Sequence, residues 1–170
     1  MACTTLTSIT KGCDGNIGGI TQVLINDQAN ITAITETDAT WTIDAITTTG
    51  GGFIPFEIRR NSGNYTEEEA NDLVKGSQFV TATITLMFSR REASKSRSLK
   101  ILGEGQRDLA VIIKDANEKY WYFPNAQLSA VTEGSGTAKA DGSSYSVVLL
   151  AENLYLAKEV DADIIAGLID

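Results

Sequence analysis

A run of alternating side chains constrains the fold of this chain more than any other feature of its sequence. Between residues 80 and 88 every second position is apolar, and the positions between them begin with a ladder of threonines. The apolar positions are Val80, Ala82, Ile84, Leu86 and Phe88, and the ladder is Thr81, Thr83 and Thr85. A period of two residues is the signature of a β-strand with one buried face. We therefore predict a long strand here whose second face is polar but uncharged.

Further strands are predicted along most of the chain. Shorter alternations occupy residues 40–45 and 54–58, where Pro55 indicates an edge strand or a bulge. Two hairpins follow, one built from residues 109–114 and 119–123 and one from residues 128–138 and 144–151. We expect Asn117 to adopt a positive φ in the turn of the first hairpin. Seven or eight strands are too many for one flat sheet in 170 residues, so the sequence predicts a mainly β sandwich or barrel.

Helical signals are few. One flanking helix is predicted over residues 93–102, which lack Gly and Pro and end before Gly103. A short C-terminal helix is predicted over residues 161–170, where Asp161 can cap the first turn. Its apolar residues at helical spacing are Ile164, Ile165 and Leu168.

Two segments lack a clear period. Residues 61–77 are predicted to form an extended hairpin loop between two long strands, and the Gly-rich residues 1–19 are predicted to form an N-terminal arm. No linker or internal repeat divides the chain, so we expect residues 1–170 to form a single domain.

Charge and composition narrow the function. The formal net charge of −8 argues against a basic groove that grips nucleic acid, because such binding depends on clustered Lys and Arg. No stretch approaches about 20 apolar residues and the start lacks a signal-peptide pattern, so we expect a soluble protein made in the cytoplasm. Cys3 and Cys13 could form a disulfide, but two reduced thiols are favoured in an intracellular protein.

The sequence offers little material for catalysis. It contains no histidine, which removes the usual general base and the commonest metal ligand. The two cysteines do not make a zinc site, and the glycine clusters lack the lysine of a phosphate-binding loop. We therefore predict that the protein is not an enzyme and holds no cofactor and no metal. The aromatic residues 120–123 are better explained by packing on two faces of a strand than by a binding platform.

The order of these elements resembles a known family. A Gly-rich start is followed by strands, a long hairpin, a helix, two hairpins and a terminal helix, an order similar to that of bacteriophage tail tube proteins and the tube proteins of contractile injection machines. Residues 53–88 look like the long hairpin of that family, residues 93–102 like its helix, and residues 109–123 like the hairpin that follows. The resemblance implies a small β-sandwich or barrel with one flanking helix, stacked as hexameric rings.

The same resemblance implies the role of a virion structural protein. The chain would be a tail tube subunit, made in the host cytoplasm and located in the virion tail, whose stacked rings form a conduit for DNA delivery. Its partners would be copies of itself and other tail or neck proteins, with DNA only in passive transit and no membrane. The face that carries Thr81, Thr83 and Thr85 would line the lumen, because an uncharged lining lets DNA slide.

Contacts between subunits are implied as well. The N-terminal arm, the segment 61–77 and the C-terminal helix with Ile164, Ile165 and Leu168 would join neighbouring rings. The acidic residues Glu67, Glu68 and Glu69 would meet a basic cluster on a neighbour, formed by Arg90, Arg91, Lys95, Arg97 and Lys100. Independent solvated charges explain the two clusters equally well.

Two other functions stay open at this stage. A head-to-tail connector or neck ring protein of a phage would form a single ring rather than an open-ended stack. A carbohydrate-binding β-sandwich module would expose the aromatic side chains of residues 120–123.

Overall fold

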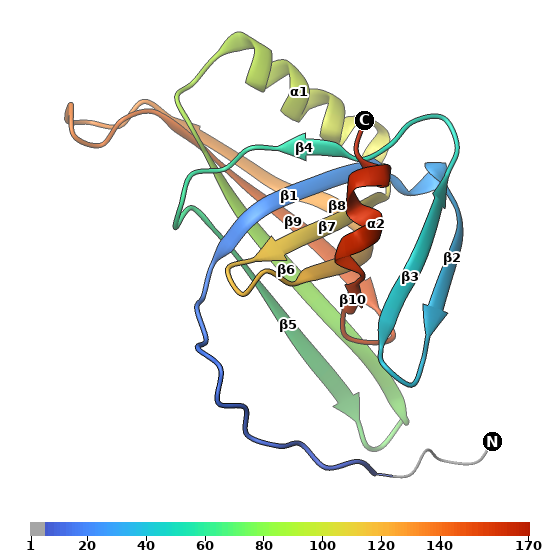
Figure 1. The fold of residues 1–170 in the computed structure, drawn as a ribbon. Coiled ribbons are helices and arrows are strands. Elements are labelled where there is room, and N and C mark those ends of the chain that lie inside the picture. The colour runs from blue at the N-terminus through green and yellow to red at the C-terminus, as the bar shows by residue number, and fades with distance from the viewer. Residues whose placement is uncertain (1–5) are drawn as a thin grey trace.

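The computed structural model describes residues 6–170, which form ten strands and two α-helices (Figure 1). The strands are β1 (Ile20–Asp27), β2 (Ile31–Thr37), β3 (Thr42–Thr48), β4 (Ile54–Phe56), β5 (Gly63–Asp72), β6 (Ser77–Ser89), β7 (Leu109–Asp115), β8 (Tyr120–Gly134), β9 (Ser144–Asn153) and β10 (Lys158–Val160). The helices are α1 (Ala93–Gly103) and α2 (Ala162–Leu168), and two short 3-10 turns are η1 (Gln28–Asn30) and η2 (Glu104–Gln106). The predicted mainly β fold, the flanking helix and the C-terminal helix are confirmed.

The first layer of the fold runs from β4 through β1 and β7 to β8, and continues through β10 and β3 to β2. Its strand β7 begins with five consecutive buried residues, 109–113. An unbroken apolar run is what a strand covered on both faces requires. Successive side chains point to opposite sides, so Val111 and Ile113 lie in one core while Ala110 and Ile112 lie in another. Alternate residues of β7 therefore pack in two different cores.

The second layer consists of β5, β6, β9 and the second half of β8, all paired antiparallel. β8 belongs to both layers, because its first half pairs with β7 and its second half with β9. The strand bends near Asn125, whose φ is 53°, and at a bulge between Leu128 and Ala130. The prediction of separate strands before and after this point is wrong, since Pro124 and Asn125 redirect the strand without ending it.

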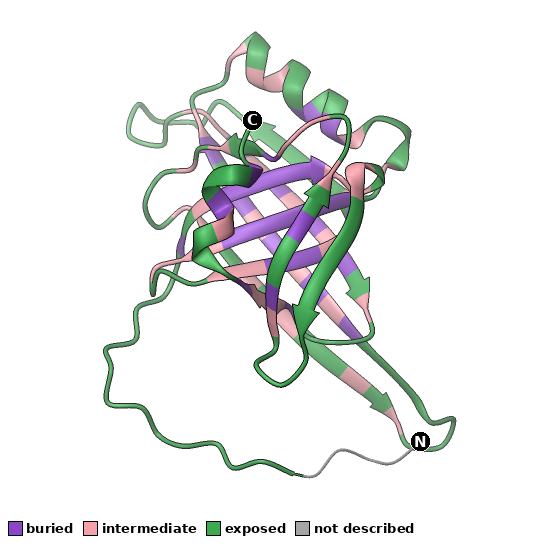
Figure 2. Ribbon diagram, turned by 45° about the vertical axis from the view of Figure 1, so that its right-hand side comes forward, coloured by how far each residue is buried: buried purple, intermediate pink, exposed green. Residues whose placement is uncertain are grey.

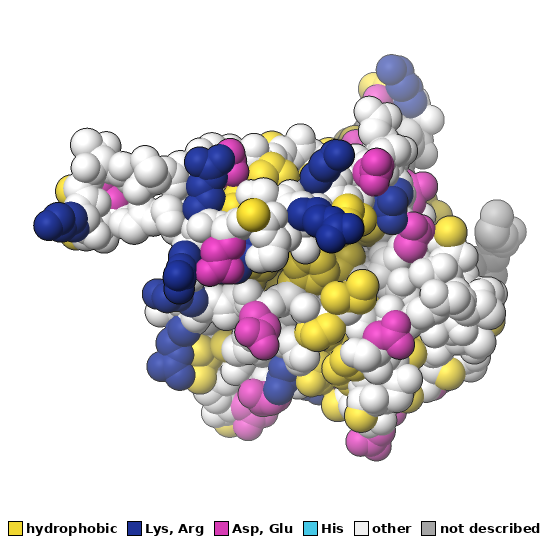
Figure 3. Space-filling view, turned by 90° about the horizontal axis from the view of Figure 1, so that it is seen from above, with side chains coloured by type: hydrophobic (Ala, Val, Ile, Leu, Met, Phe, Trp, Pro, Cys, Tyr) yellow, Lys and Arg dark blue, Asp and Glu magenta, His cyan; other side chains and the backbone are white. Residues whose placement is uncertain are grey.

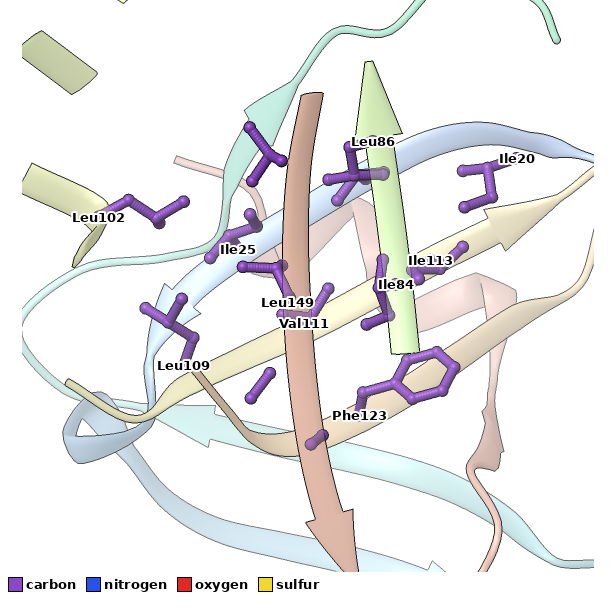
Figure 4. Packing of buried hydrophobic residues seen from close by; sticks show 14 of the residues in the cluster. Ile20, Ile25, Ile84, Leu86, Leu102, Leu109, Val111, Ile113, Phe123 and Leu149 are labelled. Carbon is purple, nitrogen blue, oxygen red and sulfur yellow. The ribbon is translucent and has the colours of Figure 1, made fainter. Parts of the chain in front are cut away.

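The main core fills the space between the two layers (Figure 4). Ile84 of β6 and Leu149 of β9 face Val111 of β7 across this space, and all three are fully buried. Leu99 and Leu102 of α1 cover the end of this core. The amphipathic strands β6 and β9 therefore bury one face each against a strand whose first five residues are apolar.

Tyr145 of β9 ties α1 to the main core. Its side chain is buried, and its hydroxyl lies 2.6 Å from the Ser96 hydroxyl of α1. The same hydroxyl donates to the Glu92 carbonyl oxygen at 3.0 Å and accepts from the Glu92 N–H at 3.2 Å. Since Glu92 makes no side-chain cap for α1, these bonds fix the start of the helix from the core.

A second, smaller core lies on the other side of the first layer. Ile112 of β7 and Tyr122 of β8 are covered there by Ile43 of β3 and Ile165 of α2. The Asp161 carboxylate accepts from the Asp163 N–H at 3.0 Å, so the predicted cap of the C-terminal helix is confirmed.

Residues 61–77 do not form the extended loop that the sequence predicts. They contain β5, which pairs with β6 from Gly63 opposite Leu86 to Asp72 opposite Ser77. Glu, Asn and Asp are poor strand formers, but β6 offers a complete row of backbone partners, and this long-range pairing overrides the local preference. The loop is reduced to residues 73–76 at the tip of a long hairpin.

Candidate assembly surfaces

One face of the second layer points to solvent. Along β6, Ala82 and Ile84 are buried in the main core, whereas Thr81, Thr83 and Thr85 on the opposite face are only half-buried (Figure 2). The alternation predicted for this strand is therefore confirmed. We call this surface the open face, and the register adds to the threonine ladder Asn64, Thr66 and Glu68 of β5 and Val148, Leu150 and Glu152 of β9.

The open face carries no positive charge. The strand segments that form it, residues 63–72, 77–89, 127–134 and 144–153, contain no Lys and no Arg. Glu68 and Glu152 add negative charge on either side of Thr81. Binding of a phosphate backbone draws on cations that release its counterions, so this surface does not attract DNA.

The second layer has two edges that no other strand covers in the described chain. β5 pairs with β6 alone, and residues 127–134 of β8 pair with β9 alone. The backbone N–H and C=O groups along such an edge remain available to another strand. Since all three pairings inside the layer are antiparallel, β5 and the second half of β8 run in opposite directions.

The three predicted acidic contacts, Glu67, Glu68 and Glu69, do not share one face. Glu67 points inward, where its carboxylate accepts from the Ala157 N–H at 2.7 Å. Burial raises the pKa of the Glu67 carboxyl above its ordinary value of 4.5, and the bond from Ala157 offsets part of that rise. Glu69 accepts from Gln78 at 2.7 Å, and Glu68 lies on the open face.

Burial also raises the pKa of Tyr65, which lies beside Glu67 on β5, to about 12, and the charges of Asp115 and Glu67 add to that rise.

The predicted basic cluster is partly neutralised within the chain. Its first members and their acidic partners are Arg90 with Glu92 at 3.2 Å, Arg91 with Glu133 at 2.6 Å, and Lys95 with Glu92 at 3.6 Å. Arg97 and Lys100 are exposed on α1 and form no ion pair within the described residues. The surface of α1 therefore keeps a positive charge that is available to a partner.

The C-terminal helix does not present the apolar surface predicted for it. Ile165 and Leu168 are buried in the second core, and Ile164 packs against the same core. For Ile165 and Leu168 the predicted role as contacts between subunits does not fit this burial, because a side chain that fills its own core cannot also reach a neighbour. Ile164 is partly buried, and its role stays a prediction.

The N-terminal arm extends away from the layers, and its residues 6–19 are exposed (Figure 1). It meets the rest of the chain at Asn117, which accepts from the Ile17 N–H at 2.8 Å. The positive φ of that turn belongs to Glu118, at 65°, so the prediction for Asn117 is wrong. Cys13 is exposed, and the predicted alternatives for its pairing involve Cys3, which lies outside the described residues.

Three apolar surfaces were not found from the sequence, because each joins exposed residues that lie in a loop or on separate elements. Leu73 and Val74 at the tip of the β5–β6 hairpin are 94% and 95% exposed. A groove between α1 and β4 exposes Ile54 and Ile101 (Figure 3). A patch beside β10 contains Leu154, Tyr155, Leu156 and Trp41, where Trp41 and Tyr155 meet edge to face at 5.7 Å.

The aromatic run 120–123 is divided between the two cores, as predicted. Tyr120 and Tyr122 belong to the second core, and Trp121 and Phe123 to the main core. The exposed aromatic platform that a carbohydrate-binding module would need is therefore not formed by these side chains.

In the part of the chain that the structure describes, no group of three or more His, Cys, Asp or Glu side chains could hold a metal ion. Within the same residues no helix is long and apolar enough to cross a membrane.

The similarity of this chain to known proteins is weak. No family model matches the sequence, and no curated protein matches it. A chain from the virion of a native gene transfer agent particle has a TM-score of 0.38 at 9% identity, with 82% of this chain and 95% of that chain covered. A chain from the tail of an empty gene transfer agent particle, refined with C6 symmetry, has a TM-score of 0.37 at 9% identity, with coverage of 74% and 93%. Scores at this level carry no argument about function.

Proposed function

We propose that this protein is a structural subunit of a phage-like tail, and that its copies form rings that stack into a tube around passing DNA. The observation that carries the proposal is the second layer, which combines an open face without positive charge and two unpaired edges. Neither feature stabilises an isolated subunit. In a closed ring of copies, however, the two edges would pair with each other and the open face would line the lumen.

The two unpaired edges are complementary in direction. The second layer contributes four strand segments of alternating direction, so β5 of one copy can pair antiparallel with β8 of a copy related by rotation. Repetition of that contact closes a barrel in which no edge strand remains exposed, which removes the hazard of open-ended edge pairing. Assembly would then complete the strand pairing of the second layer in every subunit.

The open face becomes the lining of such a barrel. Thr81, Thr83 and Thr85 would face the lumen together with Glu68 and Glu152. This lining, which also includes the apolar Val148 and Leu150, offers no cations for phosphate binding, so DNA could pass without being retained. In this reading the protein performs no catalysis and holds no cofactor, and its partners are its own copies and other tail proteins.

The first test is electron microscopy of the purified protein over a concentration series, with the mass in solution measured in parallel. Hollow tubes that lengthen with concentration would support the proposed tube subunit. Single rings that never stack would favour a connector at the neck of the particle. A monomer at every concentration would contradict both.

A cross-linking experiment tests the edge contact itself. We would pair Thr66→Cys on β5 with Ala130→Cys or Thr132→Cys on β8 in a background where Cys3 and Cys13 are changed to Ser. Within one chain these positions lie three strand spacings apart, about 14 Å, beyond the reach of a disulfide. Oxidation should therefore give a ladder of covalent oligomers that ends at the ring size. Assembled rings without such a ladder for either pair would contradict pairing of these edges.

A further inference from the structure

The tip of the β5–β6 hairpin is an apolar knob that its own chain leaves uncovered. Leu73 and Val74 are almost fully exposed, although exposed aliphatic pairs of this kind are unfavourable in water. The turn is held rigidly beneath them, because the Asp72 carboxylate accepts from the Val74 N–H at 2.9 Å and from the Lys75 N–H at 3.0 Å. The Gly76 N–H also donates to the Asp72 carbonyl oxygen at 2.7 Å, with Gly76 at a φ of +68° that favours glycine.

An apolar groove lies at the opposite end of the molecule. It runs between α1 and β4, and Ile54 and Phe56 line it along its whole length, with Ile101 on one wall. Ile54 is 56% exposed and Ile101 is 43% exposed, so the groove also holds unburied apolar surface. Figure 3 shows this surface from above as a hollow with apolar side chains beside the cations of α1.

The knob and the groove cannot meet within one chain. Figure 1 places α1 and β4 at the top of the molecule and the tip of the β5–β6 hairpin at the bottom. A second copy displaced along the long axis of the molecule brings its knob to the groove of the first. Such a head-to-tail contact uses two different surfaces and repeats without closing, which is how a linear stack grows.

The charges around the two surfaces are complementary. Close to the knob, Glu69 and Asp72 outnumber the one cation, Lys75, whereas Glu67 points inward and Glu68 lies on the open face. On α1 the exposed Arg97 and Lys100 form no ion pair within the described residues, whereas Lys95 and Arg107 at the two ends of the groove pair with Glu92 at 3.6 Å and with Asp27 at 3.4 Å. Opposite charges around an apolar contact orient the partners and speed their encounter.

We infer that the knob of one copy, Leu73 and Val74, inserts into the α1–β4 groove of a second copy and thereby joins successive rings. The inference rests on the proposed function, for which it names the contact along the tube axis. The knob is a better occupant than the exposed N-terminal arm, because its preformed turn loses little conformational entropy on binding. The arm also lacks the excess of negative charge, since Lys11 and Asp14 cancel.

The first test is the double variant Leu73→Asp, Val74→Asp in the full-length protein. Both side chains are solvent-exposed, so the fold should be unchanged, which circular dichroism would verify. Rings should still form, whereas tubes seen by electron microscopy should become at least tenfold rarer. The variant Ile101→Asp in the groove should give the same result. A matched control, Leu6→Asp with Ile9→Asp in the arm, should leave the tubes intact.

The outcomes separate this contact from the proposed function. Tubes of normal length from the knob variant would overturn the inference, as would loss of tubes from the arm variant alone. If the unchanged protein forms no rings at all, the proposed function fails rather than the knob contact.

A cross-link provides an independent readout. Val74→Cys combined with Ile101→Cys, with Cys3 and Cys13 changed to Ser, should give reducible multimers on oxidation. Because the two positions lie at opposite ends of one chain, any disulfide must join two copies. Intact tubes that yield no such multimers would overturn the inference.

Discussion

The two layers of this fold are built from similar strands but differ in how completely they are covered. β7 in the first layer has neighbours on both faces, with the main core on one side and the second core on the other. β6 in the second layer buries one face and leaves its threonine ladder towards solvent. β7 is therefore covered on both faces within a single chain, whereas the second layer has one face and two edges that the described chain leaves free.

This difference separates the residues that stabilise the subunit from the residues that we propose for its assembly. The residues that hold the subunit together are expected in the first layer and in the two cores. Substitutions on the open face and at the free edges should leave the monomer folded and affect the assembly. The four predictions that follow test that separation, from the largest expected effect on stability to the smallest.

The largest effect is expected from Ile112→Ala in β7. Ile112 is fully buried, so the substitution should lower the free energy of unfolding by about 2–5 kcal/mol. The matched variant Leu150→Ala on the open face removes similar apolar volume from a half-buried site and should cost clearly less. Urea unfolding of both variants measures the difference, and equal losses would contradict the contrast between the layers.

A smaller effect is expected from Tyr145→Phe. The substitution removes a buried hydroxyl that bonds to Ser96 and to the backbone of Glu92, so it should cost about 1–3 kcal/mol. Amide hydrogen exchange should rise first in α1, since those bonds fix its start. Tyr155→Phe is the control, because Tyr155 is exposed and should tolerate the change.

The triple variant Thr81→Lys, Thr83→Lys, Thr85→Lys should change the stability of the monomer little, by about 0.5 kcal/mol or less for each half-buried site, because the side chains point to solvent. Tubes that still assemble from this variant should retain single-stranded DNA, with an affinity that falls as salt is added.

Nuclease digestion of the retained DNA tests whether the threonine ladder faces the lumen. DNA bound inside a tube should be protected from the nuclease. A control with Thr32, Thr35 and Thr47 changed to Lys on exposed positions of β2 and β3 should bind DNA without protecting it. Equal protection by both variants would contradict a lumen lined by the open face.

The smallest effect is expected from Glu67→Gln. Because the folded pKa of Glu67 lies above 4.5, its ionised form is penalised in the folded chain, and stability from this group is lost as pH rises through that raised pKa. The Gln variant should match the unchanged protein below pH 4.5 and be slightly more stable at pH 7. Solvent screening of a half-exposed carboxyl keeps the gain below about 1 kcal/mol. Glu68→Gln, at an exposed site on the same strand, is the matched control for the loss of one carboxylate.

Much of the fold could be predicted from local patterns. The alternation of residues 80–88 indicated β6 and its buried face, and the segment without Gly and Pro after it indicated α1. Asp161 indicated the start of α2 through its capping chemistry. Such elements can be recognised in a sequence because a strand or helix that buries one face repeats its apolar residues with the period of that secondary structure.

Only the tertiary structure decided the rest. β5 forms a strand because β6 provides hydrogen-bond partners for its backbone. Its run of acidic and amide residues contains no local pattern that predicts this pairing. Whether Ile165 and Leu168 face a neighbour or their own core depended on where α2 docks. The knob and the groove likewise join residues whose exposure follows from long-range packing. The sequence by itself determined which segments form most of the strands and which of their faces are apolar. The pairing of distant strands determined which faces and edges stay uncovered. The reason is that the hydrogen-bond partners of an edge, and the side chains that cover a face, come from residues far away in the chain.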